Sequence, residues 1–167
     1  MRANRSQRVR QFVVDGLLML MLARSAAAAQ PQIAIITAPD APQLTLDHNM
    51  LRDVYLKKVF VDGQGTPLTP VNLPSGAPLR EAFTRVLLHM DGNQLQDYWD
   101  RQYFQGVSPP YVLASQDAVV RFVATTPGAI GYVATCHVDT SVHVALTVSL
   151  PARTIDDISD CSEHHTP

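Results

Sequence analysis

Segment 73–83 (LPSGAPLREAF) carries the residues best suited to binding a ligand. A strand is expected to end here, Ser75 and Gly76 are typical of a turn, and a proline follows that suits the first turn of a helix. Backbone N–H groups at a helix start carry partial positive charge, and a hydroxyl and a guanidinium add donors suited to phosphate or carboxylate. We therefore expect Ser75, the backbone at Gly76 and Ala77, and Arg80 to bind a small anion.

A purely structural role for the same residues is the alternative. Ser75 would then cap the helix, and Arg80 would pair with a surface acid such as Asp91. Both arrangements are common at helix starts, so the sequence leaves both open.

Enzyme motifs are absent from the sequence. It contains no Gly-x-Ser-x-Gly elbow, no Gly-x-Gly-x-x-Gly turn, no P-loop and no His-Glu-x-x-His helix. Six histidines and several serines could still form a catalytic triad in space, because triads are recognised by geometry and not by order. We expect a non-enzyme without a cofactor, and a hydrolase or metal-dependent enzyme is the third hypothesis after the two given below.

The chain has two cysteines, Cys136 and Cys161. In an oxidising compartment they are expected to form one disulfide that ties the C-terminal segment to the core. The competing interpretation is a zinc cluster of these cysteines with three histidines, His137, His164 and His165. The spacing lacks the tight paired ligands of known zinc sites, so we expect the disulfide and no metal.

Residues 1–29 have the layout of a secretory signal peptide. Four arginines precede a short apolar run at 16–23, and alanines at 26–29 supply small residues before Gln30. The apolar run is far shorter than the roughly 20 residues of a membrane-spanning helix. We expect cleavage, secretion, and one mature domain at 30–167.

The charge of the chain is unevenly distributed. Of its 13 basic residues five lie in the first 29 positions, so the rest carries eight bases against 14 acids. An acidic body without a basic stripe is a poor partner for nucleic acid, where neutralised phosphates supply most of the affinity. Apolar residues make up 46% of the sequence and charged residues 17%, which is typical of a folded globular domain.

Strands and helices are expected to alternate along the mature chain. Apolar runs predict strands at 33–38, 68–73, 111–114, 129–134 and 142–148, and Pro70 places the second of them at a sheet edge or at a strand start. Helical spacing of apolar residues predicts helices at 46–59, 79–90 and 94–104 and one after Ser115, with Phe83 and Phe122 on buried faces. The pattern indicates an α/β domain with helices packed on a small mixed sheet.

Four segments resemble the short periplasmic phosphate ABC transporter substrate-binding-like proteins of the type 2 periplasmic-binding-protein superfamily. They are LRDVYLKKVFVDGQGTPLTPV at 51–71, SGAPLREAFTRVLL at 75–88, YWDRQYFQG at 98–106 and VRFVATTPGAIGYV at 120–133. The last is the most specific, and its glycines Gly128 and Gly131 are expected to supply backbone freedom between helix and strand.

The resemblance implies a single lobe of a type 2 periplasmic-binding-protein-like fold that binds phosphate or a related anion and works with an ABC permease. Full-length members close two lobes over the ligand, and 30–167 supplies about one. Phosphate-binding members are similar to Arg-x-Asp-x-Ser-Gly-Thr where this chain has NLPSGA at 72–77, so only Ser75 and Gly76 match and Arg80 would supply the charge. The alternative is an accessory module that keeps the fold without binding a ligand and docks to another envelope protein or forms a homodimer.

Overall fold

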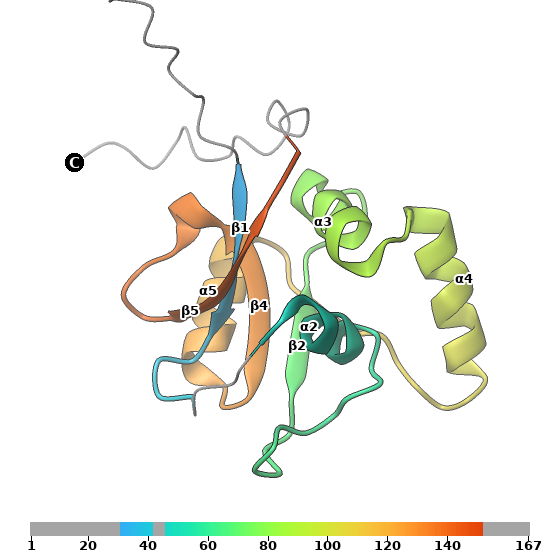
Figure 1. The fold of residues 1–167 in the computed structure, drawn as a ribbon, viewed down its shortest axis with the longest axis horizontal. Coiled ribbons are helices and arrows are strands. Elements are labelled where there is room, and N and C mark those ends of the chain that lie inside the picture. The colour runs from blue at the N-terminus through green and yellow to red at the C-terminus, as the bar shows by residue number, and fades with distance from the viewer. Residues whose placement is uncertain (1–30, 42–45, 152–167) are drawn as a thin grey trace, which may run out of the picture.

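The computed structural model describes residues 31–41 and 46–151, which form one mixed sheet flanked by helices (Figure 1). Its strands have the order β3-β2-β4-β1-β5. The central β4 pairs with β1 in antiparallel and with β2 in parallel orientation, and β2 is parallel to β3. The strands are β1 Gln32–Thr37, β2 Thr69–Asn72, β3 Tyr111–Val112, β4 Ala129–Ala134 and β5 His143–Ser149.

Helices lie on both faces of the sheet (Figure 1). They are α2 His48–Tyr55, α3 Pro78–Phe83, the π-helix η1 Thr84–Leu88 that continues α3, α4 Gly92–Tyr103, α5 Gln116–Thr125 and the 3-10 helix η2 Thr135–His137. The α/β class and the expected elements are confirmed. Among these described helices, none is long and apolar enough to cross a membrane.

Alternation along β4 divides the core into two layers, because successive strand side chains point to opposite faces. A Cβ on Gly131 would lie 2.4 Å from Val119 Cγ1, so this position needs glycine for the close approach of α5 and not for a special φ. On the other face, Tyr132 stacks on Phe83 of α3, with ring centroids 3.9 Å apart. Tyr55 of α2 meets Phe83 edge-on at 4.7 Å.

Pro70 lies near the start of β2, as predicted, but β2 is an interior strand and not an edge. Pro70 pairs with Ile130 of β4, while β3 pairs only with Val71 and Asn72 further along. The side of β2 next to Pro70 therefore has no strand partner in the described sheet, and a residue without an N–H is tolerated there.

The predicted helix 79–90 is not α-helical throughout, since its second half is the π-helix η1. It ends at His89, which has a left-handed φ of 56°. The expected burial of Phe122 is also wrong: this side chain is half-buried, because Val119 and Val123 take the centre of the α5 contact with the sheet.

The two ends of the described domain are adjacent. β1 and β5 pair along their length, from Gln32 opposite Ser149 to Thr37 opposite His143. Beyond that ladder, Leu150 N donates to Pro31 O at 2.9 Å.

Three groups of predicted features lie outside the described residues: the signal peptide, Cys161, and the two histidines His164 and His165. The disulfide from Cys136 and the zinc alternative therefore stay untested predictions.

Asp62 organises the turn that precedes β2. Its Oδ1 accepts from Gln64 N and from Thr66 N, each at 2.8 Å, and the Thr66 N–H is the main cause of a pKa below the usual 3.8. A lowered pKa means that the carboxylate adds stability above its unfolded pKa and loses it as the pH falls through the folded value.

We predict that Asp62→Asn destabilises the protein at pH 6 and that the deficit shrinks as the pH falls below about 4. Thermal unfolding between pH 6 and pH 3 measures the difference. Asp97→Asn, on the exposed face of α4, controls for the loss of one surface charge. Parallel stability curves for the wild type and Asp62→Asn would contradict the role of this carboxylate.

Candidate functional site

The loop between β2 and α3 is a fixed turn. Ala77 N donates to Pro74 O at 3.1 Å, and Gly76 between them has a φ of +85°. A positive φ at this place suits glycine, which lacks the Cβ that strains other residues. Pro74, Ser75 and Gly76 are exposed, so the tip of the loop is open to solvent.

Arg80 reaches back from α3 to the start of this loop. Its Nη1 donates to Leu73 O at 2.6 Å. This bond uses one of the five N–H donors of the guanidinium. Within the part of the chain that the structure describes, no carboxylate is ion-paired with Arg80, so the expected alternative of a pair with Asp91 is not formed. The guanidinium is half-buried and held in place by a backbone carbonyl.

The buried end of β2 supports the loop from below. Tyr132 OH donates to Asn72 Oδ1 at 3.0 Å and accepts a long hydrogen bond of 3.4 Å from Leu73 N. Burial raises the pKa of Tyr132 far above its usual 10.0, so its hydroxyl keeps the proton that it donates. Leu73, whose carbonyl holds Arg80, is therefore itself held by the hydrogen bond from its N–H to the buried Tyr132 hydroxyl.

A pocket of about 260 Å³ lies between α3 with η1 on one side and α4 on the other. Three of the four predicted ligand residues line it: Ser75, Gly76 and Arg80. Ala77 does not line it, and its N–H donates within the turn to Pro74 O. Ser75 is not the helix cap either, since Ala77 occupies that position.

The α4 side of this pocket and its second arginine were not predicted from the sequence. Arg85 lines it from η1, and Leu95 and Trp99 line it from one face of α4. In an α-helix, residues five apart lie about 140° apart around the axis. Arg80 lies in α3 and Arg85 near the start of the π-helix η1, and both nevertheless line the pocket.

The acids of the pocket are Glu81 and Asp91. Asp91 is the cap of α4: its Oδ1 accepts from Gln94 N at 2.9 Å, and Gln94 Oε1 accepts from Asp91 N at 2.9 Å. This capping box fixes the start of α4, the helix whose Leu95 and Trp99 line the same pocket as Arg80.

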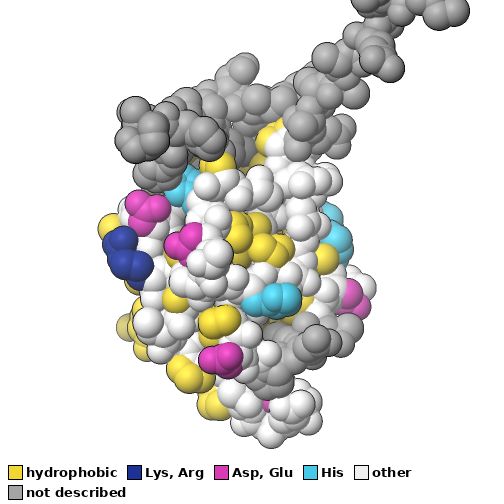
Figure 2. Space-filling view, turned by 90° about the vertical axis from the view of Figure 1, so that its left-hand side faces the viewer, with side chains coloured by type: hydrophobic (Ala, Val, Ile, Leu, Met, Phe, Trp, Pro, Cys, Tyr) yellow, Lys and Arg dark blue, Asp and Glu magenta, His cyan; other side chains and the backbone are white. Residues whose placement is uncertain are grey.

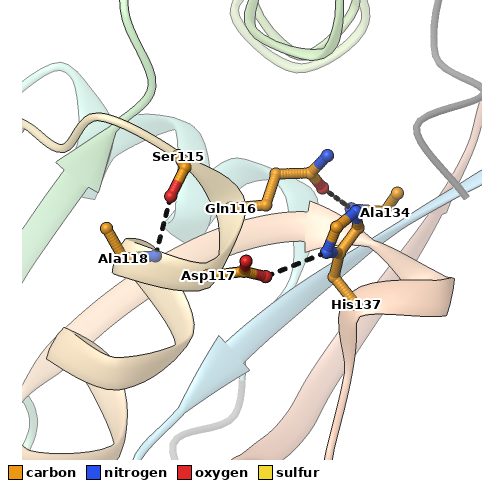
Figure 3. Close-up of polar contacts among 6 residues, drawn as sticks. All are labelled: Ser115, Gln116, Asp117, Ala118, Ala134 and His137. Atoms are coloured by element: carbon orange, nitrogen blue, oxygen red, sulfur yellow. Dashed lines mark hydrogen bonds and ion pairs between the residues drawn. The ribbon is translucent and has the colours of Figure 1, made fainter. Parts of the chain in front are cut away.

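A second polar cluster joins the start of α5 to the end of β4 (Figure 3). His137 Nδ1 lies 3.2 Å from Asp117 Oδ1, and Gln116 Oε1 accepts from Ala134 N at 2.6 Å. Ser115 Oγ accepts from Ala118 N at 3.2 Å and points away from His137, so the cluster is not a Ser-His-Asp triad. Its contacts cap α5 and fix it to the sheet.

The face that carries β5 is shown in Figure 2. Hydrophobic side chains gather near its centre, histidines and acidic residues are scattered, and basic side chains appear only at one edge. A nucleic-acid surface needs a basic stripe, and this face has none.

Within the described residues, no group of three or more His, Cys, Asp or Glu side chains could hold a metal ion.

Comparison with protein-family models and with curated proteins gives no match. Among solved structures, the chain is similar to a protein described as a phosphate ABC transporter substrate-binding protein, with bound phosphate, from Clostridium perfringens. The TM-score is 0.56 and the identity 21%, over 68% of this chain and 44% of that one. An ABC-type phosphate transport receptor from Vibrio cholerae gives a TM-score of 0.57 and 19% identity, with the same coverage of both chains. The described residues share the fold of part of these two substrate-binding proteins, and the chain spans 44% of their length.

Proposed function

We propose that this protein is a periplasmic substrate-binding domain that binds phosphate or a related small oxyanion beside the β2–α3 loop. The observation that carries the proposal is Arg80, whose guanidinium lines a pocket, is anchored by Leu73 O and has no acidic partner in the described part of the chain. Ser75 adds a hydroxyl at the same pocket. Guanidinium and hydroxyl groups are the donors that oxyanions prefer.

The similar solved structures support a binding role and not catalysis, since both are described as transport receptors or substrate-binding proteins. By analogy with them, an ABC permease is the expected partner of the loaded domain. Ala77 would take part only if the turn opened, because its N–H donates to Pro74 O.

We predict saturable binding of phosphate with a dissociation constant on the order of micromolar, measured by isothermal titration at low ionic strength. Arg80→Ala should weaken binding about 10- to 100-fold, because it removes charge-assisted hydrogen bonds to the anion. Arg80→Lys should recover only part of the affinity, since an ammonium cannot bond Leu73 O and the anion in the planar geometry of a guanidinium.

Ser75→Ala should also weaken binding, and Arg121→Ala is the matched control, because Arg121 is exposed on α5 and does not line the pocket. Equal affinity of Arg80→Ala and Arg121→Ala for phosphate would exclude this site. No saturable heat with phosphate, sulfate or carboxylates would exclude anion binding altogether.

An accessory interaction module is the second candidate function, and exposed aromatic side chains favour it. Tyr103 and Phe104, at the end of α4, are 73% and 88% exposed, and their ring centroids lie 6.1 Å apart. Sedimentation over a range of concentrations tests this candidate. A homodimer that Phe104→Ser dissociates would support it, and a monomer at every concentration would argue against self-association.

A further inference from the structure

We propose that the pocket between α3 and α4 takes an organic oxyanion, a phosphate or phosphonate that carries a small apolar or aromatic group, in preference to free phosphate. This inference rests on the proposed function, because it uses the anion site at Arg80. It assigns a role to the α4 side of the pocket, which free phosphate bound at Arg80 would leave empty.

The first reason is size. A volume of about 260 Å³ holds roughly nine water-sized groups at about 30 Å³ each. Phosphate has only one phosphorus and four oxygens, so it leaves part of that space unfilled. The volume lies just below the range of about 300 to 1,000 Å³ for pockets that hold drug-sized molecules, which limits the organic group to a small one.

The second reason is the chemistry of the α4 wall. Leu95 and Trp99 lie four residues apart on one helix face, and both are nearly buried, with 7% and 8% of their surface exposed. Trp99 lines the pocket with an aromatic side chain, which prefers offset or edge-on contact with another ring. Leu95 has no hydrogen-bond donor and Trp99 has one indole N–H, so this wall offers free phosphate little and offers an apolar substituent a place to be buried.

The third reason is the charge of the pocket. Arg80 and Arg85 are balanced by Glu81 and Asp91, so the formal charge of the lining is zero. Free phosphate and an organic phosphate are both anions, so a lining without net positive charge attracts neither of them strongly by charge alone. A neutral lining with one anchored guanidinium suits a ligand that gains part of its affinity from apolar contact.

Trp99 makes the proposal measurable, because it is the only tryptophan of the chain. The experiment titrates the purified full chain with phenyl phosphate, with inorganic phosphate and with phenol, and follows both heat and Trp99 fluorescence. We expect phenyl phosphate to bind at least about tenfold tighter than phosphate and to change the fluorescence, and phenol to bind weakest.

Two variants assign the effect to the α4 wall. Trp99→Leu should reduce the preference for phenyl phosphate over phosphate to less than about threefold while phosphate still binds. Because Trp99 is nearly buried, Gln96→Phe is the second variant: it fills the pocket from an exposed lining position and should lower the affinity for phenyl phosphate more than that for phosphate. Asn93→Phe, exposed on the same helix but outside the lining, is the control and should bind like the wild type.

The outcomes separate the two proposals. If phosphate binds and phenyl phosphate binds no tighter, the inference about the organic group is overturned and the anion site stands. If neither ligand binds, both are overturned. A preference for phenyl phosphate that Gln96→Phe leaves unchanged would place the organic group outside this pocket and would also overturn the inference.

Discussion

Replacing Phe83 by alanine should lower the free energy of unfolding by about 3 to 5 kcal/mol. The ring is 1% exposed and contacts two other rings, stacked on Tyr132 and edge-on to Tyr55. Its removal leaves a cavity that neither neighbour fills without breaking hydrogen bonds: Tyr132 OH bonds Asn72, and Tyr55 OH bonds backbone carbonyls of β2 and β4. Denaturant unfolding measures the change.

Two phenylalanines serve as controls for that experiment. Phe104→Ala should be nearly neutral, because its side chain is 88% exposed. Phe122→Ala should fall between the two, since Phe122 is half-buried against the outside of the core. An unfolding midpoint of Phe83→Ala equal to that of Phe104→Ala would contradict the aromatic layer described above.

Gly128→Ala should destabilise the protein by about 3 kcal/mol or more. A Cβ at this position would lie 2.1 Å from Pro67 O, and backbone atoms cannot move away as a flexible side chain can. The φ of +75° adds strain of about 1 to 2 kcal/mol for any residue with a Cβ. Gly128 O also accepts from Thr69 N at 2.8 Å, so a shift of this backbone disturbs the pairing of β2 with β4.

Alanine substitutions at two other glycines distinguish the cost of the steric clash with Pro67 O from the cost of the positive φ. Gly76→Ala meets the same positive φ in open space and should cost only about 1 to 2 kcal/mol. Gly63→Ala has open space and no positive φ, so its stability should stay close to that of the wild type. Thermal unfolding of the three variants should rank them Gly63, Gly76, Gly128 in order of increasing damage, and any other order would contradict this assignment.

Periodicity and capping chemistry made the elements predictable. Asp47 and Ser115, which are residue types typical of helix caps, cap α2 and α5, and the apolar run 129–134 is β4 as predicted. These signals are local, so a single sequence contains them. The order of strands is not local, and for that reason the sequence left open whether Pro70 marks a sheet edge or a strand start; it lies at the start of β2, which is inside the sheet.

The candidate site was half predictable for a similar reason. Ser75, Gly76 and Arg80 follow one another in a loop and a helix turn, where local rules apply. Arg85 lies in a segment that is π-helical and not α-helical as predicted, and Trp99 joins the pocket because α4 lies beside α3 and η1. No residue type marks a π turn in the sequence, since it depends on how the helix is accommodated by its neighbours.

The hydrogen bond between Leu150 N and Pro31 O has a consequence for how such a unit can be combined with others. A domain whose first and last strands are paired neighbours can be inserted into a surface loop of a host protein without forcing the two ends of that loop apart. The same geometry allows a short linker to join these ends, so that new termini could be opened elsewhere on the surface while the sheet keeps its order.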